Sequence, residues 1–224
     1  MKLVTYRSST SRDLRGGILV GDLVIDLERG FQHRERAEGR PSQPSDIAQR
    51  YGSGILGFVE HADVARSTAD ALVREHAKAP LGNDLTVPLA DVTLASPLPR
   101  PPSMRDGYAF RQHVATARKN RGLEMIPEFD QFPVFYFTNH QAVIGPGDLH
   151  IQKLHTDKLD FELEAAIVLG KGGKNVRAED ADELIFGLTI MNDFSARTLQ
   201  MEEMKLSLGP AKGKDFATDR KSVV

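Results

Sequence analysis

The sequence contains no cysteine in its 224 residues. This absence excludes a disulfide framework, thiolate-bound zinc, iron–sulfur clusters and cysteine nucleophiles. It is typical of a reducing compartment. The N-terminus also lacks the apolar stretch and small-residue cleavage site of a signal peptide, so we expect a cytoplasmic protein.

Long apolar runs and an excess of one charge are lacking too. No segment approaches the roughly 20 apolar residues that a membrane helix requires, so we expect no membrane partner. With 29 Lys and Arg residues against 31 Asp and Glu residues and no long basic run, the sequence indicates no phosphate-binding surface, and nucleic acid is not an expected partner. What is present is the composition of an ordinary globular chain, with 40% hydrophobic residues.

The first third of the sequence has the features of a separate small domain. A strand over residues 3–6 and a hairpin (17–20 and 23–27, turning at Gly21) precede helices over 45–51 and from Asp63 onward. The second helix is expected to turn Val64, Ala71, Leu72 and Val73 toward the core. The proline-rich residues 96–102 resemble a linker, so the boundary is expected within 79–102, giving domains 1–90 and 100–224.

Two glycine-rich segments resemble nucleotide-binding motifs but lack the required context. Residues 52–57 match G-x-G-x-x-G, yet residues 46–51 before them are predicted as helix, where a dinucleotide site needs a buried strand. We interpret this segment as a corner between two helices. Residues 209–215 resemble a phosphate-binding loop, but the glycine spacing is short and Asp215 replaces the Ser or Thr that binds magnesium.

The rest of the chain is predicted to mix strands with a few helices. We expect a helix over 106–120 that stops before Gly122. Strands are expected over 134–138, 158–169 and 184–191. A last helix is expected over 195–205 with Ser195 as its N-cap.

Carboxylates gather on one face of the strand predicted over 158–169. Side chains alternate along a strand, so Asp160, Glu162 and Glu164 share a face, and the apolar residues between them predict a buried opposite face. Two carboxylates so placed repel each other unless a cation or a proton lies between them. A solvated strand end is an equally good interpretation of this segment alone. Asp193, after the next apolar strand, adds an oxygen ligand, and such a set suits Mg²⁺, Mn²⁺ or Ca²⁺ better than zinc.

Two further pairs of residues could serve this site. Asp106 and His113 are seven apart, so on the predicted helix they share a face, with room for water, metal or substrate between them. Arg197 and Gln200 are three apart and share a helix face. Read alone, the second pair slightly favours a solvated helix with surface salt bridges.

Four segments together resemble one known family. R-D-G-Y-A-F-R-Q-H, D-F-E-L-E, M-N-D-F-S-A-R-T-L-Q and L-G-P-A-K-G-K-D-F-A-T resemble, in order and spacing over residues 106–218, the fumarylacetoacetate hydrolase family. The resemblance implies an α+β, β-rich fold, in which a small N-terminal β/α domain precedes part of a mixed β-roll of the fumarylacetoacetase C-terminal type. The family continues its roll after the position of Thr218, where this sequence reads D-R-K-S-V-V and ends at Val224, so we expect about half of the roll.

The resemblance also implies roles for individual residues. They are metal ligands (Glu162, Glu164, Asp193 and, in some members, Asp106), catalytic groups (His113, Lys214, Arg197 and Gln200) and substrate-binding groups (Tyr108, Tyr136 and Thr218). The implied cofactor is a divalent ion, Mg²⁺ or Ca²⁺, with Mn²⁺ as an alternative. The implied assembly is a homodimer.

The activity implied by the resemblance is metal-dependent hydrolysis of a carbon–carbon bond in a 1,3-diketone or acylpyruvate, as in aromatic catabolism. His113 would activate the water, and Lys214 would lower the energy of the developing enolate. Met204 stands where fumarylacetoacetase has a pocket tyrosine, which argues against fumarylacetoacetate as the substrate. Two alternatives stay open: decarboxylation, isomerisation or hydration of a related 2-oxo acid, and a non-catalytic binding or assembly fragment.

Overall fold

The computed structural model describes residues 1–9, 11–40 and 43–223. Val224 lies outside the described residues. It shows a mixed α+β, sheet-rich fold, as predicted. Within the described ranges, nine strands form one sheet in which β4, β3, β2, β1, β11, β10 and β9 follow one another, while β5 pairs with β1 and β8 with β11. A separate two-stranded ribbon joins β6 and β7.

The N-terminal part of the sheet is built from short strands with tight turns. Its strands are β1 (Lys2–Ser8), β2 (Arg15–Val20), β3 (Leu23–Asp26), β4 (Thr86–Pro88) and β5 (Val92–Leu94). The predicted β2–β3 hairpin is confirmed. Gly21 occupies its turn with φ of 57°, a left-handed conformation that glycine adopts without strain.

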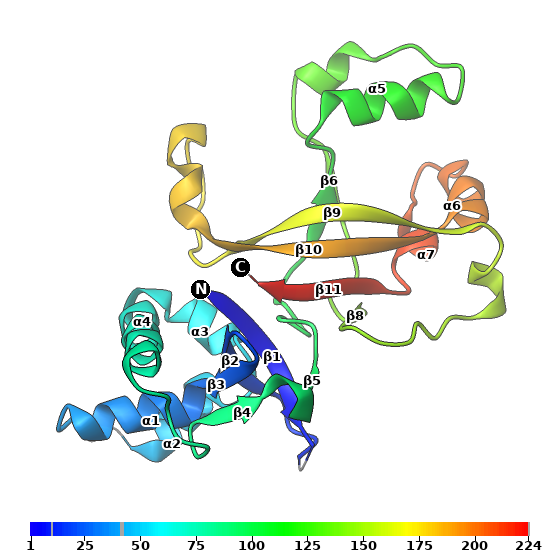
Figure 1. The fold of residues 1–224 in the computed structure, drawn as a ribbon. Helices are drawn as coiled ribbons and strands as arrows, with labels where there is room; N and C mark the ends of the chain where they lie inside the picture. The colour runs from blue at the N-terminus through cyan, green and yellow to red at the C-terminus, as the bar shows by residue number, and fades with distance from the viewer. Residues whose placement is uncertain (10, 41–42, 224) are drawn as a thin grey trace.

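Four helices pack on this part of the sheet (Figure 1): α1 (Leu27–Ala37), α2 (Pro44–Tyr51), α3 (Leu56–Glu60) and α4 (Ala62–Lys78). The helix predicted over 45–51 and the corner between α2 and α3 are confirmed. Leu72 of α4 is fully buried, but Val64 is 71% exposed, so the prediction that it faces the core is wrong. The helix α1 was not predicted; the carboxylate of Asp26 caps it by accepting the Arg29 N–H.

The remainder carries the long strands (Figure 1). Its elements are β6 (Arg105–Gly107), α5 (Arg111–Lys119), β7 (Phe135–Phe137), β8 (Val143–Ile144), β9 (Leu159–Leu169), β10 (Ile185–Ala196), α6 (Arg197–Met204), α7 (Ala211–Lys214) and β11 (Thr218–Val223). Short 3-10 turns cover Leu89–Asp91, Pro127–Asp130, Lys153–His155 and Ala178–Leu184. The strand predicted over 158–169 is confirmed almost to the residue.

Two predicted boundaries in this part are wrong. Asp106 lies on β6 rather than on a helix, because its segment pairs with β7, and α5 begins only at Arg111. The strand β10 continues through Asp193 to Ala196, so Asp193 lies inside a strand and Ser195 is not a helix cap. Pairing with β9 along the whole length of β10 overrides the local Asn-Asp and Ser signals.

The N-terminal and C-terminal parts of the chain share sheet and core. Leu3 of β1 pairs with Val223 of β11, and Val168 of β9 belongs to the same apolar cluster as Leu27 and Phe58. Arg66 of α4 donates to the carbonyl oxygen of Phe186 at 2.6 Å. The contacts of Val168 and Phe186 hold the end of the β9–β10 hairpin at which the two strands are connected. The division into domains 1–90 and 100–224 stays a prediction.

One face of β9 is open to solvent. Along the described residues β9 pairs only with β10, so it forms the edge of the sheet. Leu163 is 71% exposed, and Phe161, Ile167 and Leu169 are exposed beside it. The expectation that this apolar face is buried is therefore wrong, because nothing in the described part of the chain packs over it.

Among the described residues, no helix combines the length and the apolar character that crossing a membrane requires.

Candidate metal centre and active site

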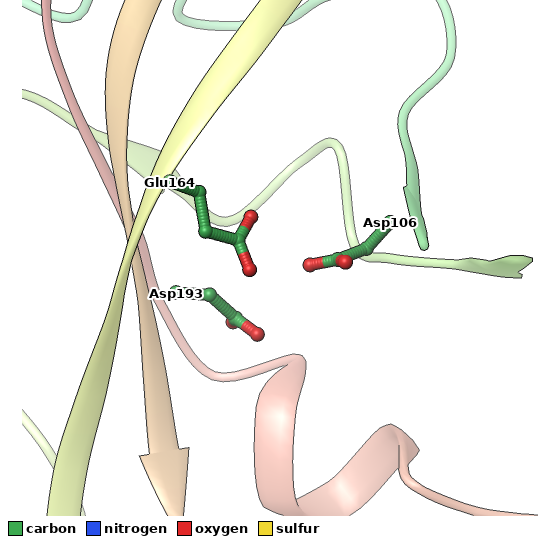
Figure 2. Close-up of side chains that lie close together, drawn as sticks. All are labelled: Asp106, Glu164 and Asp193. Carbon is green, nitrogen blue, oxygen red and sulfur yellow. The ribbon is translucent and has the colours of Figure 1, made fainter. Parts of the chain in front are cut away.

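Three carboxylates from three separate strands converge at one point (Figure 2). Asp106 comes from β6, Glu164 from β9 and Asp193 from β10. One oxygen of each lies within 4.8 Å of the other two. The antiparallel register pairs Asp193 with Glu162 and Met191 with Glu164, which places both acidic strands side by side, and the β6–β7 ribbon brings Asp106 to them.

This crowding changes the acidity of all three groups. Burial, together with the neighbouring carboxylates of Asp106 and Asp193, raises the pKa of Glu164 to about 8. Burial raises the pKa of Asp193 to about 6 although Lys214 opposes the change, and burial also raises the pKa of Asp106. The cluster therefore needs a proton or a cation at neutral pH.

The donor set fits a hard divalent cation. All three groups offer oxygen, which Mg²⁺, Mn²⁺ and Ca²⁺ prefer. Asp193 is 1% exposed, and its Oδ1 is buried without a hydrogen-bond partner. A buried carboxylate oxygen without a donor is costly, and a metal ion would satisfy it.

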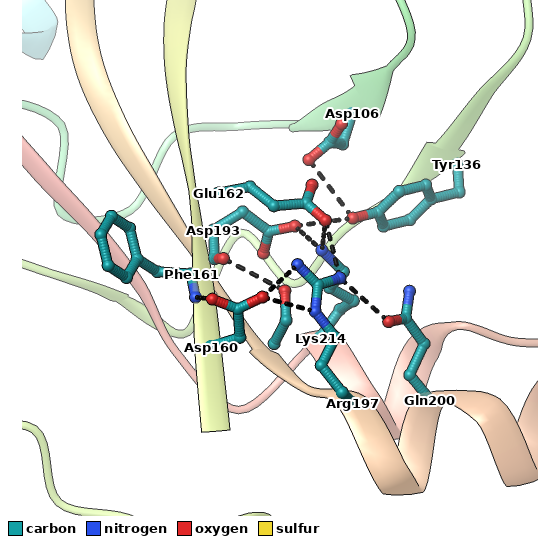
Figure 3. Close-up of polar contacts among 10 residues, drawn as sticks. Asp106, Tyr136, Asp160, Phe161, Glu162, Asp193, Arg197, Gln200 and Lys214 are labelled. Carbon is teal, nitrogen blue, oxygen red and sulfur yellow. Dashed lines mark hydrogen bonds and ion pairs between the residues drawn. The ribbon is translucent and has the colours of Figure 1, made fainter. Parts of the chain in front are cut away.

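A buried lysine contacts Asp193 (Figure 3). The side chain of Lys214 is 3% exposed, and its Nζ lies 2.5 Å from Asp193 Oδ2 and 3.1 Å from Glu162 Oε1. Burial alone would raise the pKa of Glu162, but Lys214 and Arg197 hold it below its ordinary value. Glu162 and Glu164, two residues apart on one strand face, thus meet opposite electrostatic environments.

Arg197, at the start of α6, ties this network to the helix. Its Nη1 lies 2.8 Å from Glu162 Oε1 and 3.1 Å from Gln200 Oε1, while Nε and Nη2 each lie 2.9 Å from Asp160 Oδ2. Glu162, an expected metal ligand, is thus occupied by two cations and lies outside the group of three carboxylates. Asp160, whose role sequence reasoning missed, anchors Arg197.

Tyr136 of β7 lies within hydrogen-bond distance of two of the three carboxylates. Its hydroxyl lies 3.3 Å from Asp106 Oδ2 and 3.2 Å from Asp193 Oδ2. Burial and both carboxylates raise its pKa above the ordinary value, so the phenol keeps its proton and donates it.

A cavity of about 470 Å³ opens beside the carboxylates. Its walls include the expected site residues Asp106, Tyr108, His113, Tyr136, Glu162, Glu164, Gln200 and Lys214. His113 reaches it from α5, with its ring centroid 6.1 Å from that of Tyr108. The prediction that His113 and Asp106 share one face of a helix is wrong. They lie on different elements, and both line the cavity.

Thr218 is placed elsewhere. It is buried on β11, in register with Asp193, and does not line the cavity. The structure therefore puts Thr218 beside Asp193 on the neighbouring strand and not in the wall of the cavity.

The segment that carries Lys214 depends on a residue that the sequence did not reveal. Glu203 of α6 accepts the backbone N–H groups of Lys212 and Gly213, each at 2.9 Å, which fixes α7 to α6. A Cβ at Gly213 would lie 2.7 Å from the Cβ of Gln200, so only glycine permits this approach. A lone glutamate on a predicted helix gives no sequence signal for this role.

Comparison with known proteins decides the family. The family model "Fumarylacetoacetate (FAA) hydrolase C-terminal" matches residues 103–219, more than half of the chain. The chain belongs to the fumarylacetoacetate hydrolase family. The matched range contains all the carboxylates described above, together with His113, Arg197 and Lys214.

Relatives in this family are named for different reactions. The oxaloacetate tautomerase YisK of Bacillus subtilis is 35% identical over 128 residues, covering 54% of this chain and 39% of the relative. The fumarylacetoacetase of Oryza sativa is 55% identical over 238 aligned residues, covering 91% and 53%. The chain spans about half the length or less of these relatives.

Solved structures agree on the fold. The maleylpyruvate hydrolase of Sphingobium sp. SYK-6, solved with manganese(II) and pyruvate, superimposes with a TM-score of 0.60 at 18% identity, over 100% of this chain and 67% of that one. At this identity the likeness shows the fold alone.

Proposed function

We propose that this chain carries the metal-binding and acid–base groups of an enzyme that hydrolyses a carbon–carbon bond in an acylpyruvate or related 1,3-diketone. The observation that carries the proposal is the cavity lined by Asp106, Glu164, Lys214 and His113, with the buried carboxylate of Asp193 within reach of both Asp106 and Glu164. The relative named fumarylacetoacetase supports the reaction class.

Asp106, Glu164 and Asp193 would hold the divalent ion, for which Mg²⁺, Ca²⁺ and Mn²⁺ are the candidates. Such an ion, when bound, supplies Lewis-acid polarisation of a 2-oxo acid's oxygens. Glu162 lies outside this group, and its Oε1 is held by Lys214 and Arg197.

The chain's other groups would handle the proton and the charge. A ring nitrogen of His113 would take a proton from the attacking water at the acyl carbonyl. The carbon–carbon bond would break to release an enolate, whose charge the buried Lys214 Nζ would stabilise. Gln200 and Tyr108, which line the cavity, would hold the substrate, and Arg197 would hold Glu162 and Gln200 in place. Tyr136 would fix the orientation of Asp106 and Asp193.

The test is an activity panel with acetylpyruvate, fumarylpyruvate and oxaloacetate in the presence of Mg²⁺ or Mn²⁺. We expect turnover of an acylpyruvate and its loss in His113→Ala. Undiminished hydrolysis by His113→Ala would overturn the assignment of His113 as the base, and turnover of oxaloacetate alone would overturn the hydrolase proposal.

Tautomerisation or decarboxylation of oxaloacetate is the second candidate, because a relative at 35% identity is named an oxaloacetate tautomerase. These reactions use the same carboxylate cluster but need no attacking water. Retention of oxaloacetate turnover in His113→Ala, without acylpyruvate turnover in the wild type, would favour them.

An assembly role is favoured by the exposed apolar face of β9. Phe161, Leu163, Ile167 and Leu169 expose a strip of the kind that protein interfaces cover. We expect two copies of the chain to associate through it. Light scattering that finds only monomers at micromolar concentration would refute this association.

A further inference from the structure

The walls of the active-site cavity differ sharply in polarity. The carboxylates Asp106 and Glu164 line part of it, whereas Phe110, Val134, Phe135 and Met204 contribute apolar side chains. A molecule that places a 2-oxo acid group at the carboxylate cluster would therefore extend the rest of its length along an apolar surface.

Cations that could receive a second carboxylate are scarce here. Of the described residues that line this cavity, none is an arginine and Lys214 is the single lysine. Its Nζ is already bound by Asp193 and Glu162. A charged tail would lose its hydration next to acidic and apolar groups without gaining an ion pair, and that is unfavourable.

Arginines line a neighbouring cavity. A second cavity, of about 520 Å³, is lined by Arg118, Arg121 and Arg197. Both cavities share Tyr108, His113, Glu162, Gln200 and Met204 as lining residues. Among these shared residues, Met204 is the purely apolar side chain, and it offers no hydrogen-bond donor at the boundary.

We propose that Met204 is a specificity-determining residue that makes this site select a substrate with an uncharged, apolar tail over one whose tail ends in a carboxylate. The proposal rests on the proposed function, since it takes the 2-oxo acid end to lie at Asp106, Glu164 and Asp193. It deepens that function by naming the class of acyl group.

Two ligands of equal length test the proposal by binding alone. 2-Oxohexanoate and 2-oxoadipate both contain six carbons, and they differ in ending with a methyl or a carboxylate group. Calorimetry on the full chain with Mg²⁺ should show at least a tenfold tighter Kd for 2-oxohexanoate. Met204→Arg should shift this ratio at least fivefold toward 2-oxoadipate, whereas Met204→Leu should keep it.

The outcomes separate the two ideas. Equal or tighter binding of 2-oxoadipate by the wild type, or an unchanged ratio in Met204→Arg, overturns the role of Met204 while the proposed function stands. If neither acid binds and oxalate with Mg²⁺ does not bind either, the proposed function fails and the inference fails with it. Because Met204 is 40% exposed, both variants should fold, and circular dichroism melts check this.

Discussion

Replacing Glu164 by glutamine should stabilise the metal-free chain. The wild-type carboxyl has a pKa of about 8, against an ordinary 4.5, because it is buried beside Asp106 and Asp193. A raised pKa favours the folded state at low pH, and this contribution is lost as pH rises through about 8. At pH 7 the raised pKa of Glu164 therefore lowers the free energy of unfolding by on the order of 1–3 kcal/mol. Each pKa unit corresponds to about 1.4 kcal/mol, and the value is reduced because the site is only part-buried. Glutamine has no charge to suppress and avoids this cost.

Glu162→Gln is the matched control, two residues away on the same strand face. Its carboxylate has a lowered pKa and lies within ion-pair distance of Lys214 and Arg197. Removing its charge leaves Lys214, 3% exposed, with fewer partners. We expect this variant to be destabilised by about 1–3 kcal/mol, the opposite sign to Glu164→Gln.

Thermal melts in EDTA, at about pH 5 and about pH 8, measure both variants. Glu164→Gln should raise the Tm by roughly 3–10 °C at the higher pH and by much less at the lower pH. Addition of Mg²⁺ should raise the Tm of the wild type and not that of Glu164→Gln. If both variants lower the Tm equally at both pH values, the reasoning from carboxylate repulsion is refuted.

Three further predictions follow from the same contacts. Metal affinity measured by calorimetry should fall at least tenfold from about pH 8 to about pH 6, because protons on Glu164 and Asp193 compete with the ion; a flat profile would contradict the cluster. Lys214→Met should destabilise the chain by about 3 kcal/mol or more in denaturant melts, since it leaves two carboxylates without their buried cation; an unchanged midpoint would show that the contact contributes nothing. Glu203→Ala should cost about 1–2 kcal/mol by releasing the N-terminus of α7, and Glu203→Gln should restore part of it; equal loss in both variants would contradict the hydrogen-bond role.

Local patterns predicted the elements whose neighbours are close in sequence. The β2–β3 hairpin, the helix α2 and the strand β9 follow from turn chemistry and from residue spacing. The end of β10 could not be read in this way. Its Asn-Asp and Ser signals predict a strand end and a helix cap, but pairing with β9 through Ala196 extends the strand.

The site was predictable as a set of residue types and not as a geometry. Alternation along β9 correctly put Glu162 and Glu164 on one face. Placing Asp106 beside them requires the β6–β7 pairing, and no local pattern encodes a three-residue strand with a partner 30 residues away. The role of Glu203 could not be predicted from the sequence either, because it depends on a contact with a backbone segment that begins nine residues further on.

The carboxylate pair on β9 shows how the fold resolves a conflict that the sequence only poses. Alternation predicts repulsion that a cation or a proton must relieve, and either would suffice. The structure uses a different answer for each residue: Glu162 is neutralised by cations of the chain itself, whereas Glu164 is left with acidic neighbours. A site in which every carboxylate had its own lysine or arginine would gain much less from a bound metal ion. The energetic cost of leaving Glu164 unpaired would therefore favour a cation at the proposed site, and the opposite signs expected for the two glutamine variants measure that division directly.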